Sequence, residues 1–191
     1  MDTLINRVQR AAMLDVDLYE KVEADTSLNN EALMVVILVS IAGGIGSFIG
    51  GVIKGNIGSA LLSLVITVLL GVVNYYIWAY VTYFVGTNLF DGTADPGEML
   101  RVLGYASGPR LLSVLGFIPC LGALISLAGA VWALVAGVIA VRQALDFDTT
   151  KAVLTCVIGW VIVLIISFAV SMALGVGAIG LGALGSILGR R

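Results

Sequence analysis

Long uncharged runs of apolar residues are the feature that most constrains this chain. Residues 32–53 form a run of 22 residues without a charge, and residues 57–86 form another of 30. At about 1.5 Å per residue, an α-helix of about 20 residues crosses the roughly 30 Å hydrocarbon core of a bilayer. Charged residues make up only 12% of the chain, about half the share in a soluble protein, so such runs cannot be covered in water. The sequence therefore predicts an all-α integral membrane protein.

We predict a five-span transmembrane helical bundle over residues 32–174. Residues 1–31 are predicted to form a cytoplasmic or interfacial N-terminal helical segment, and residues 175–191 a Gly-rich apolar tail associated with the membrane. The predicted spans are residues 32–53, 57–86, 102–120, 121–141 and 152–174. The end of the second span is rich in tyrosine and tryptophan, which favour the boundary between lipid and water.

The N-terminal segment holds seven of the twelve acids and lacks the apolar core of a signal peptide, so we expect it to be retained. Apolar residues recur at helical spacing over residues 4–12, which predicts a short amphipathic helix. A second helix is predicted over residues 15–24. These helices either lie along the lipid headgroups or cap the bundle.

The predicted third span contains the segment Gly108-Pro109-Arg110 and ends at Pro119. Proline lacks an N–H group and disfavours a helical residue before it, so this span should kink or break near its middle. Arg110 is then the one charge within a predicted span. A central arginine costs about 3 kcal/mol on insertion scales, unless it snorkels to the interface, faces a wet cavity or finds an acceptor. Backbone carbonyls freed at the proline break are candidate acceptors.

Composition excludes several classes of function. The chain has no histidine, which removes the commonest general base and transition-metal ligand. Its two cysteines form no metal-ligand cluster, and the loop acids after Asp91 do not match the spacing of a calcium loop, because Pro96 stands where glycine is needed. A net charge of −2 gives no basic excess for nucleic acid. We expect no catalytic residue, no cofactor, no metal and no nucleic-acid partner.

Small residues repeat at every fourth position in two predicted spans, a spacing that lets helices approach closely in lipid. Two interpretations stay open, which are homodimerisation and packing within the bundle. The residues of these two stripes are Ala42, Gly46 and Gly50 in the first span and Gly129, Ala133 and Gly137 in the fourth.

The distribution of basic residues predicts the orientation. With the amino terminus in the cytoplasm, five spans leave six basic residues inside and three outside, in agreement with the positive-inside rule. We therefore expect an integral protein of the cell membrane with a cytoplasmic amino terminus and the carboxyl terminus on the opposite side.

The segment Leu100-Arg101-Val102-Leu103-Gly104-Tyr105-Ala106-Ser107-Gly108-Pro109, followed by Phe117-Ile118-Pro119, resembles the signature of the Yip family of multi-span membrane proteins. The resemblance covers roughly residues 30–175 and includes the basic end of the fourth span before Gln143-Ala144-Leu145. Asp17-Leu18-Tyr19 is followed by Glu20-Lys21 in place of the Gly-Pro that completes the motif of eukaryotic members. The chain is thus similar to the short prokaryotic members, and the trafficking role of the eukaryotic ones does not carry over.

The resemblance implies a protein that acts through protein and lipid contacts, without a catalytic reaction. Our leading hypothesis is a non-enzymatic scaffold, assembly or membrane-organising factor, and a second version of it is a subunit of a larger membrane complex. The expected partners are lipids and other membrane proteins or a second copy. The alternative is a small channel or transporter that uses the break at Pro109 and Arg110. We expect Gly104, Tyr105 and Pro109 to set the bend of the third span, Arg101 to anchor its cytoplasmic end and Arg110 to brace its interior.

Overall fold

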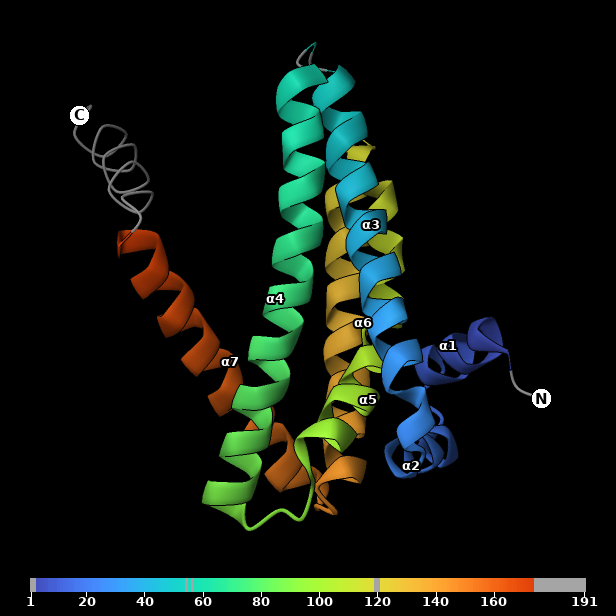
Figure 1. The fold of residues 1–191 in the computed structure, drawn as a ribbon, viewed down its shortest axis with the longest axis vertical. Helices are drawn as coiled ribbons and strands as arrows, with labels where there is room; N and C mark the ends of the chain where they lie inside the picture. The colour runs from blue at the N-terminus through green and yellow to red at the C-terminus, as the bar shows by residue number, and fades with distance from the viewer. Residues whose placement is uncertain (1–2, 54, 56, 119–120, 174–191) are drawn as a thin grey trace.

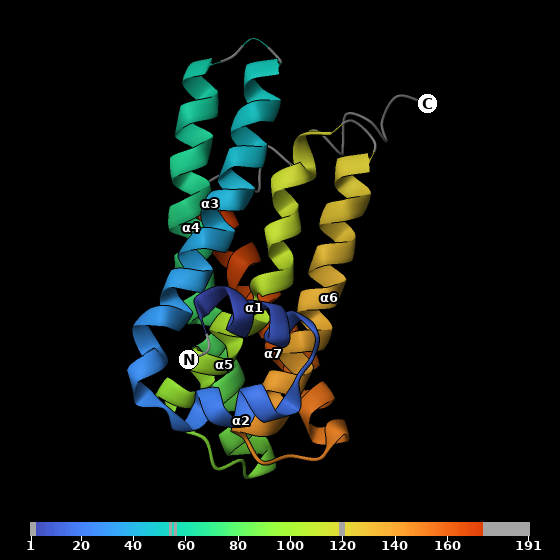
Figure 2. The same cartoon turned by 90° about the vertical axis from the view of Figure 1, so that its right-hand side faces the viewer.

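The computed structural model describes residues 3–53, 55, 57–118 and 121–173, and within them the chain is helical and contains no strand. The all-α fold class is confirmed for this part of the chain; the predicted tail and Pro119 lie outside it. Figures 1 and 2 show the arrangement of the elements. In chain order these are α1 (Leu4–Ala12), α2 (Val16–Ala24), the 3-10 helix η1 (Thr26–Leu28), α3 (Asn29–Ile53), α4 (Ile57–Phe90), α5 (Pro96–Ala106), the 3-10 helix η2 (Gly108–Phe117), α6 (Leu121–Ala144) and α7 (Thr149–Ala173).

The two short N-terminal helices begin where a side chain caps their first turn. The Thr3 hydroxyl accepts a backbone N–H of α1 at 3.3 Å, and the Asp15 carboxylate accepts one of α2 at 3.3 Å. The two helices are joined by the Tyr19 hydroxyl, which donates to the Ala11 carbonyl at 3.1 Å. α2 also buries the side chains of Leu18, Tyr19 and Val22.

Among the described residues, four helices are long and apolar enough to cross a membrane, namely Thr26–Ile53, Ile57–Phe90, Leu121–Ala144 and Thr149–Val170. They overlap the first, second, fourth and fifth predicted spans. α3 and α4 form an antiparallel hairpin (Figure 2), in which Gly51 lies so close to Ala60 that a Cβ atom on Gly51 would be 2.7 Å from the Cβ of Ala60. α7 leans away from the other helices along its length (Figure 1).

α4 is longer than the span predicted for it. Its 34 residues would extend about 51 Å, well beyond a hydrocarbon core of about 30 Å. The predicted loop from residue 87 is helical as far as Phe90, where the Thr87 and Asn88 side chains donate to the carbonyls one turn before them. The C-terminal end of α4 therefore belongs to the polar end of the molecule.

The third predicted span is divided into two different helices. α5 begins earlier, at a capping box in which Asp95 and Glu98 exchange two hydrogen bonds of 2.8 Å, and it ends at Ala106. η2 has ten residues, and at about 2.0 Å per residue it rises only about 20 Å, which is short of a hydrocarbon core. Of the kink or break predicted near the middle of this span, the described residues show a break at Ser107, and the four long apolar helices of the described chain do not confirm the five-span count.

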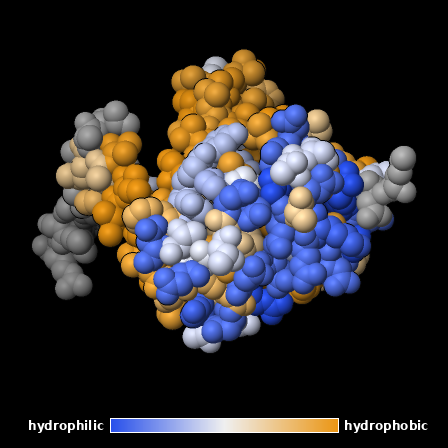
Figure 3. All heavy atoms as spheres, turned by 60° about the horizontal axis from the view of Figure 1, so that its bottom comes forward, coloured by the Kyte–Doolittle hydropathy of each residue, from blue (hydrophilic) through white to orange (hydrophobic). Residues whose placement is uncertain are grey.

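We name α1, α2, η1 and α5 the cap. Figure 3 shows hydrophilic residues gathered over this end of the molecule, while hydrophobic residues cover the helices that rise from it. Beneath the cap surface lies the best-packed part of the core, where side chains from α3, α5 and α6 are almost completely buried, among them Val35, Met99, Val102 and Val141. The cap is therefore packed as one body with the base of the bundle.

Candidate functional site

Arg101 ties the end of α2 to α5 and the start of α3 from the inside of the cap. Its side chain is buried, at 2% exposure, and donates to the main-chain carbonyls of Val22 and Glu23 and to the Asn29 side-chain oxygen. The distances are 3.0 Å from Nε to Val22 and 3.0 Å to Asn29. Because the acceptors come from α2 and α3, the predicted anchoring residue serves here as an internal tie between three helices.

Glu31 forms a second tie, at the start of α3. Its carboxylate accepts two hydrogen bonds from the Arg7 guanidinium of α1, at 2.7 and 2.5 Å, in the bidentate geometry that arginine favours. The hydroxyl of Tyr105, which is fully buried, donates to the same carboxylate at 2.5 Å. One acid thus connects α1, α3 and α5.

Gly104 allows α5 and α3 to approach closely enough for this connection. A Cβ atom at residue 104 would lie 2.8 Å from the Cβ of Ala32 and 2.9 Å from its carbonyl oxygen. Both distances are shorter than a van der Waals contact, so only glycine fits. The Gly104-Tyr105 pair therefore brings two backbones together and places a phenol beside Glu31.

Pro109 opens η2 and is buried. The chain breaks at Ser107, whose hydroxyl donates to the Gly104 carbonyl at 2.6 Å, while its backbone N–H donates to the same carbonyl at 3.3 Å. Gly108 lies against Val8 of α1, which places this break directly next to the cap. Pro109 itself packs on α6, since a Cβ on Gly129 would be 3.0 Å from its carbonyl oxygen.

The small-residue stripes are used partly inside the bundle. Gly46 of α3 faces η2, where a Cβ atom would lie 2.8 Å from the Ser113 carbonyl oxygen, and Gly129 of α6 faces η2 from the other side. Gly137 and Ala133 lie on the same helix as Gly129, buried and half-buried respectively. Ala42 is half-buried, and Gly50 has open space beside it.

A cavity of about 1300 Å³ lies between α3, α4, η2, α6 and α7. Its walls are mostly apolar and contain many small residues, since α3 and α6 turn glycine and alanine toward it. No acidic residue is found among the described residues that line it. Its polar groups include the side chains of Ser40, Asn74, Trp78, Arg110 and Ser126.

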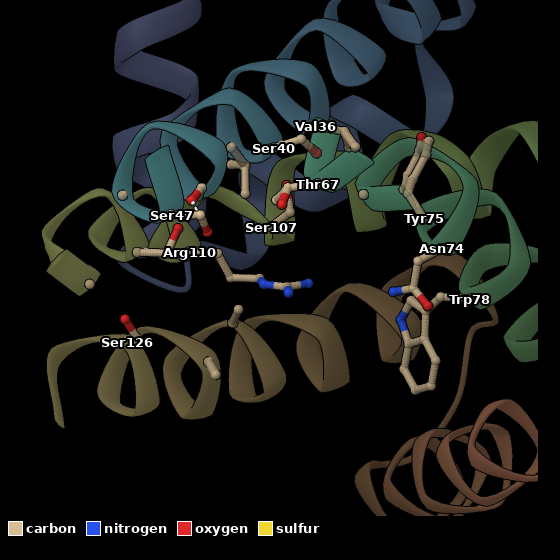
Figure 4. Close-up of a pocket in the computed structure, with 18 of the residues that line it drawn as sticks. Val36, Ser40, Ser47, Thr67, Asn74, Tyr75, Trp78, Ser107, Arg110 and Ser126 are labelled. Carbon is tan, nitrogen blue, oxygen red and sulfur yellow. Dashed lines mark hydrogen bonds between the residues drawn. The ribbon is translucent and has the colours of Figure 1, made fainter. Parts of the chain in front are cut away.

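Arg110 projects into this cavity (Figure 4). Its side chain is exposed, and within the described part of the chain it has no hydrogen bond or ion pair. The backbone carbonyls at the proline break, which were one of the candidate acceptors, therefore do not bind Arg110 within the described chain. Snorkelling, a wet cavity or an acceptor would each lower the cost of this arginine, and the structure provides the cavity.

Glu31, the acid that binds Arg7 and Tyr105, is not singled out by the sequence. Glu31 was recognised only as one of the N-terminal acids, and its partner Arg7 lies 24 residues away, beyond any spacing rule within one helix. The aromatic end of the second predicted span indicates a position for Trp78 at the boundary between lipid and water, whereas the structure places Trp78 in the lining of the cavity together with Asn74 and Arg110. The spacing of four residues between Asn74 and Trp78 puts both on one face of a helix.

Glu23 was also missed. One of its carboxylate oxygens, Oε2, is buried and has no hydrogen-bond partner among the described residues, because Arg101 binds its main-chain carbonyl instead. Burial raises the pKa of the Glu23 carboxyl to about 7, and the negative charges of Asp146, Glu98 and Glu20 act in the same direction. The charge of Arg101 opposes them.

Comparison with known proteins gives one match. The family model described as the Yip1 domain matches residues 17–186, which include all of α2 but its first residue, the whole bundle described above and both sides of the break at Ser107. None of the curated proteins and none of the solved structures matches the chain. Since the family model covers most of the chain, and since the four long apolar helices suit a membrane, this integral membrane protein belongs to the Yip1 domain family.

Proposed function

We propose that the protein is a non-enzymatic scaffold, assembly or membrane-organising factor, which acts by contacts with other membrane proteins and with lipids. The observation that carries the proposal is the divergence of α7 from the bundle (Figure 1). Large apolar side chains of this helix stay uncovered, among them Trp160 at 56% and Phe168 at 61% exposure. A helix with such a surface offers a contact site for a transmembrane helix of another protein.

The cap supports the same proposal, because it presents a rigid polar surface next to the membrane. The ties at Arg101 and Glu31 hold α1, α2 and α5 to the bundle. A partner that binds the cap therefore meets a fixed arrangement of charges, which favours specific recognition. We assign no catalytic residue and no cofactor, and the Yip family is not known as enzymatic.

Photocrosslinking tests the contact surface. A photoreactive residue is placed at Phe168 of α7 and, as a matched control, at Leu127 of α6, which is equally exposed at 61%. The proposal predicts protein adducts from residue 168 in native membranes, identified by mass spectrometry as another membrane protein or a second copy. Adducts with lipid alone from residue 168, as from residue 127, would contradict the scaffold proposal.

We place the cap on the cytoplasmic side of the cell membrane. The cap and the adjoining helix ends hold Arg7, Arg10, Lys21, Arg101, Arg142 and Lys151, and cytoplasmic segments carry an excess of such residues. Single cysteines at exposed Asp17 and at Gly55, in a background without Cys120 and Cys156, test this orientation with a membrane-impermeant reagent. Labelling of residue 55 only from outside, and of residue 17 only after lysis, is expected; the reverse pattern would overturn it.

The channel or transporter alternative keeps one supporting observation, which is the polar-lined cavity around Arg110. Broken helices with unpaired polar groups mark substrate sites in transporters. Flux of small anions into proteoliposomes, lost in Arg110→Leu, would place this alternative first. Absence of flux in sealed vesicles with correctly inserted protein would remove it.

A further inference from the structure

Three tryptophans and α1 mark the level of the membrane interface on this protein. The Trp132 indole N–H donates to the Ala12 carbonyl at the end of α1, at 2.7 Å, while Trp78 and Trp160 line one cavity. Tryptophan is enriched at the headgroup level. α1 itself exposes apolar side chains, with Ile5 at 69% exposure, as expected of a helix that touches the interface.

Arg110 lies close to this level. Gly108, two residues before it, packs against Val8 of α1, and Arg110 shares its cavity with Trp78 and Trp160. Because the break packs against α1, we infer that the guanidinium group lies near the headgroup level, in a cavity that continues into the apolar part of the bundle. This position differs from the membrane centre assumed for a continuous third span.

The polar groups of the cavity are suited to an anion. The Arg110 guanidinium, the Asn74 amide and the Trp78 indole N–H are hydrogen-bond donors, and none of them has a hydrogen-bond partner within the part of the chain that the structure describes. Figure 4 shows Arg110 extending toward the side of the cavity where Asn74 and Trp78 lie. With no acidic residue among the described lining residues, the cavity carries one uncompensated positive charge. Arginine favours phosphate because its donors match two phosphate oxygens at once.

The remaining walls are suited to hydrocarbon. α7 contributes Trp160, Val163 and Leu164 to the lining, and its divergence from the bundle leaves that side open (Figure 1). The volume of about 1300 Å³ is larger than the roughly 300–1,000 Å³ of pockets for small soluble ligands. A free anion would use only the polar base, whereas a lipid would use the base and the walls.

We propose that this cavity binds one glycerophospholipid, with its phosphate on Arg110, its polar headgroup region against Asn74 and Trp78, and its acyl chains along α7. The site deepens the lipid-contact part of the proposed function and rests on it, but it needs no partner protein. Its occupant is a lipid of the surrounding membrane, which would fill the space that the splayed α7 leaves open.

Native mass spectrometry of the purified protein in detergent tests this site with phosphatidylglycerol as the probe. Wild type is expected to retain one phosphatidylglycerol, and Arg110→Gln to bind it at least about tenfold more weakly, because the charge-assisted hydrogen bonds are lost. Arg110→Lys, which keeps the charge, should bind with intermediate affinity. Lys21→Gln is the matched control, since it removes one exposed positive charge from the cap and should bind as wild type does.

Two further probes separate the possible ligands. Dioleoylglycerol, which has the chains without the phosphate, should not replace phosphatidylglycerol, and inorganic phosphate at millimolar concentration should not displace it. Equal binding by wild type and Arg110→Gln would overturn the proposal, as would displacement by inorganic phosphate.

Because Arg110 makes no hydrogen bond within the described chain, Arg110→Gln should keep the unfolding temperature of wild type. If Arg110→Gln unfolds at a lower temperature than wild type, Asn74→Leu and Trp78→Phe are measured in its place. Weaker phosphatidylglycerol binding by these variants would support the proposal, and unchanged binding by both would overturn it. The α7 crosslinks are a separate measurement, so their absence would remove the scaffold proposal and leave this one standing.

Discussion

The hydroxyl of Tyr105 lies 2.5 Å from Oε1 of Glu31, the same oxygen that accepts the Nε–H of Arg7 at 2.7 Å. Each of these side chains belongs to a different helix, so the contact holds α5, α3 and α1 at one point. The tyrosine that forms part of the Yip signature in this chain is thereby given a structural role: it fixes the N-terminal helix to the bundle next to the break at Ser107.

Tyr105→Phe should lower the free energy of unfolding by about 1.5–3 kcal/mol, the value of a hydrogen bond to a charged group. The change removes only the hydroxyl and leaves the ring in its buried position. Thermal unfolding in detergent measures the loss. Tyr76→Phe is the control, because the Tyr76 hydroxyl is partly exposed and has no hydrogen bond among the described residues; equal effects of the two substitutions would contradict the tie.

Gly104→Ala should destabilise the protein by about 1–3 kcal/mol, since the new methyl group would overlap Ala32 and force α5 away from α3. Gly50→Ala, which adds a methyl group in open space on α3, should be neutral or stabilise by up to about 1 kcal/mol. Unfolding temperatures of the two variants, measured in the same detergent, give the comparison. A tolerated Gly104→Ala would show that the two helices are not in close contact.

Pro109→Ala should let α5 continue across Ser107, because the substitution restores an N–H donor and removes the restriction on the preceding residue. Straightening the segment would withdraw Pro109 from Gly129 of α6 and move Arg110 out of its cavity. The expected result is a lower unfolding temperature together with more α-helical circular dichroism. Unchanged expression, stability and helicity would mean that Pro109 does not cause the break.

Glu23→Gln should make the stability less dependent on pH. The pKa of Glu23 is raised to about 7 in the folded state, so its protonated form is favoured by folding; the associated stability is present below the unfolded pKa of about 4.3 and is lost as the pH rises through about 7. Glu23→Gln should therefore match wild type at pH 4 and be more stable at pH 8, as read from unfolding temperatures. Asp17→Asn removes an exposed charge from the same helix as a control, and an identical pH profile for both variants would refute the assignment.

Much of the fold could be predicted from runs of residues. The uncharged segments located the four long helices, and the apolar spacing over residues 4–12 and 15–24 located α1 and α2, because both signals depend only on neighbours in sequence. The segment around Gly108-Pro109 also predicted a break. The long helices, the short N-terminal helices and the break are set by residues that lie close together in the sequence.

The candidate site depends on contacts that sequence spacing does not encode. Arg101 was expected at a membrane boundary, but its acceptors lie more than 70 residues away in sequence, and their carbonyls are available only because α2 ends beside α5. Likewise, the length and apolarity of residues 102–120 could not distinguish a kinked span from an α-helix followed by a short 3-10 helix. The difference arises because α1 and α2 pack on α5 and on the break after it, so that α5 ends inside the protein.

The central claim is that buried contacts through α5 hold the cap on the bundle, and hydrogen–deuterium exchange of Arg101→Met in detergent tests it most directly. The substitution keeps a long side chain but removes the hydrogen bonds to Val22, Glu23 and Asn29. Deuterium uptake is predicted to rise by about tenfold or more in rate over residues 3–28 while α3 and α6 stay protected, with Lys21→Met unchanged as the exposed control. Uptake that equals wild type over residues 3–28, or that rises equally across the whole chain, would contradict the account.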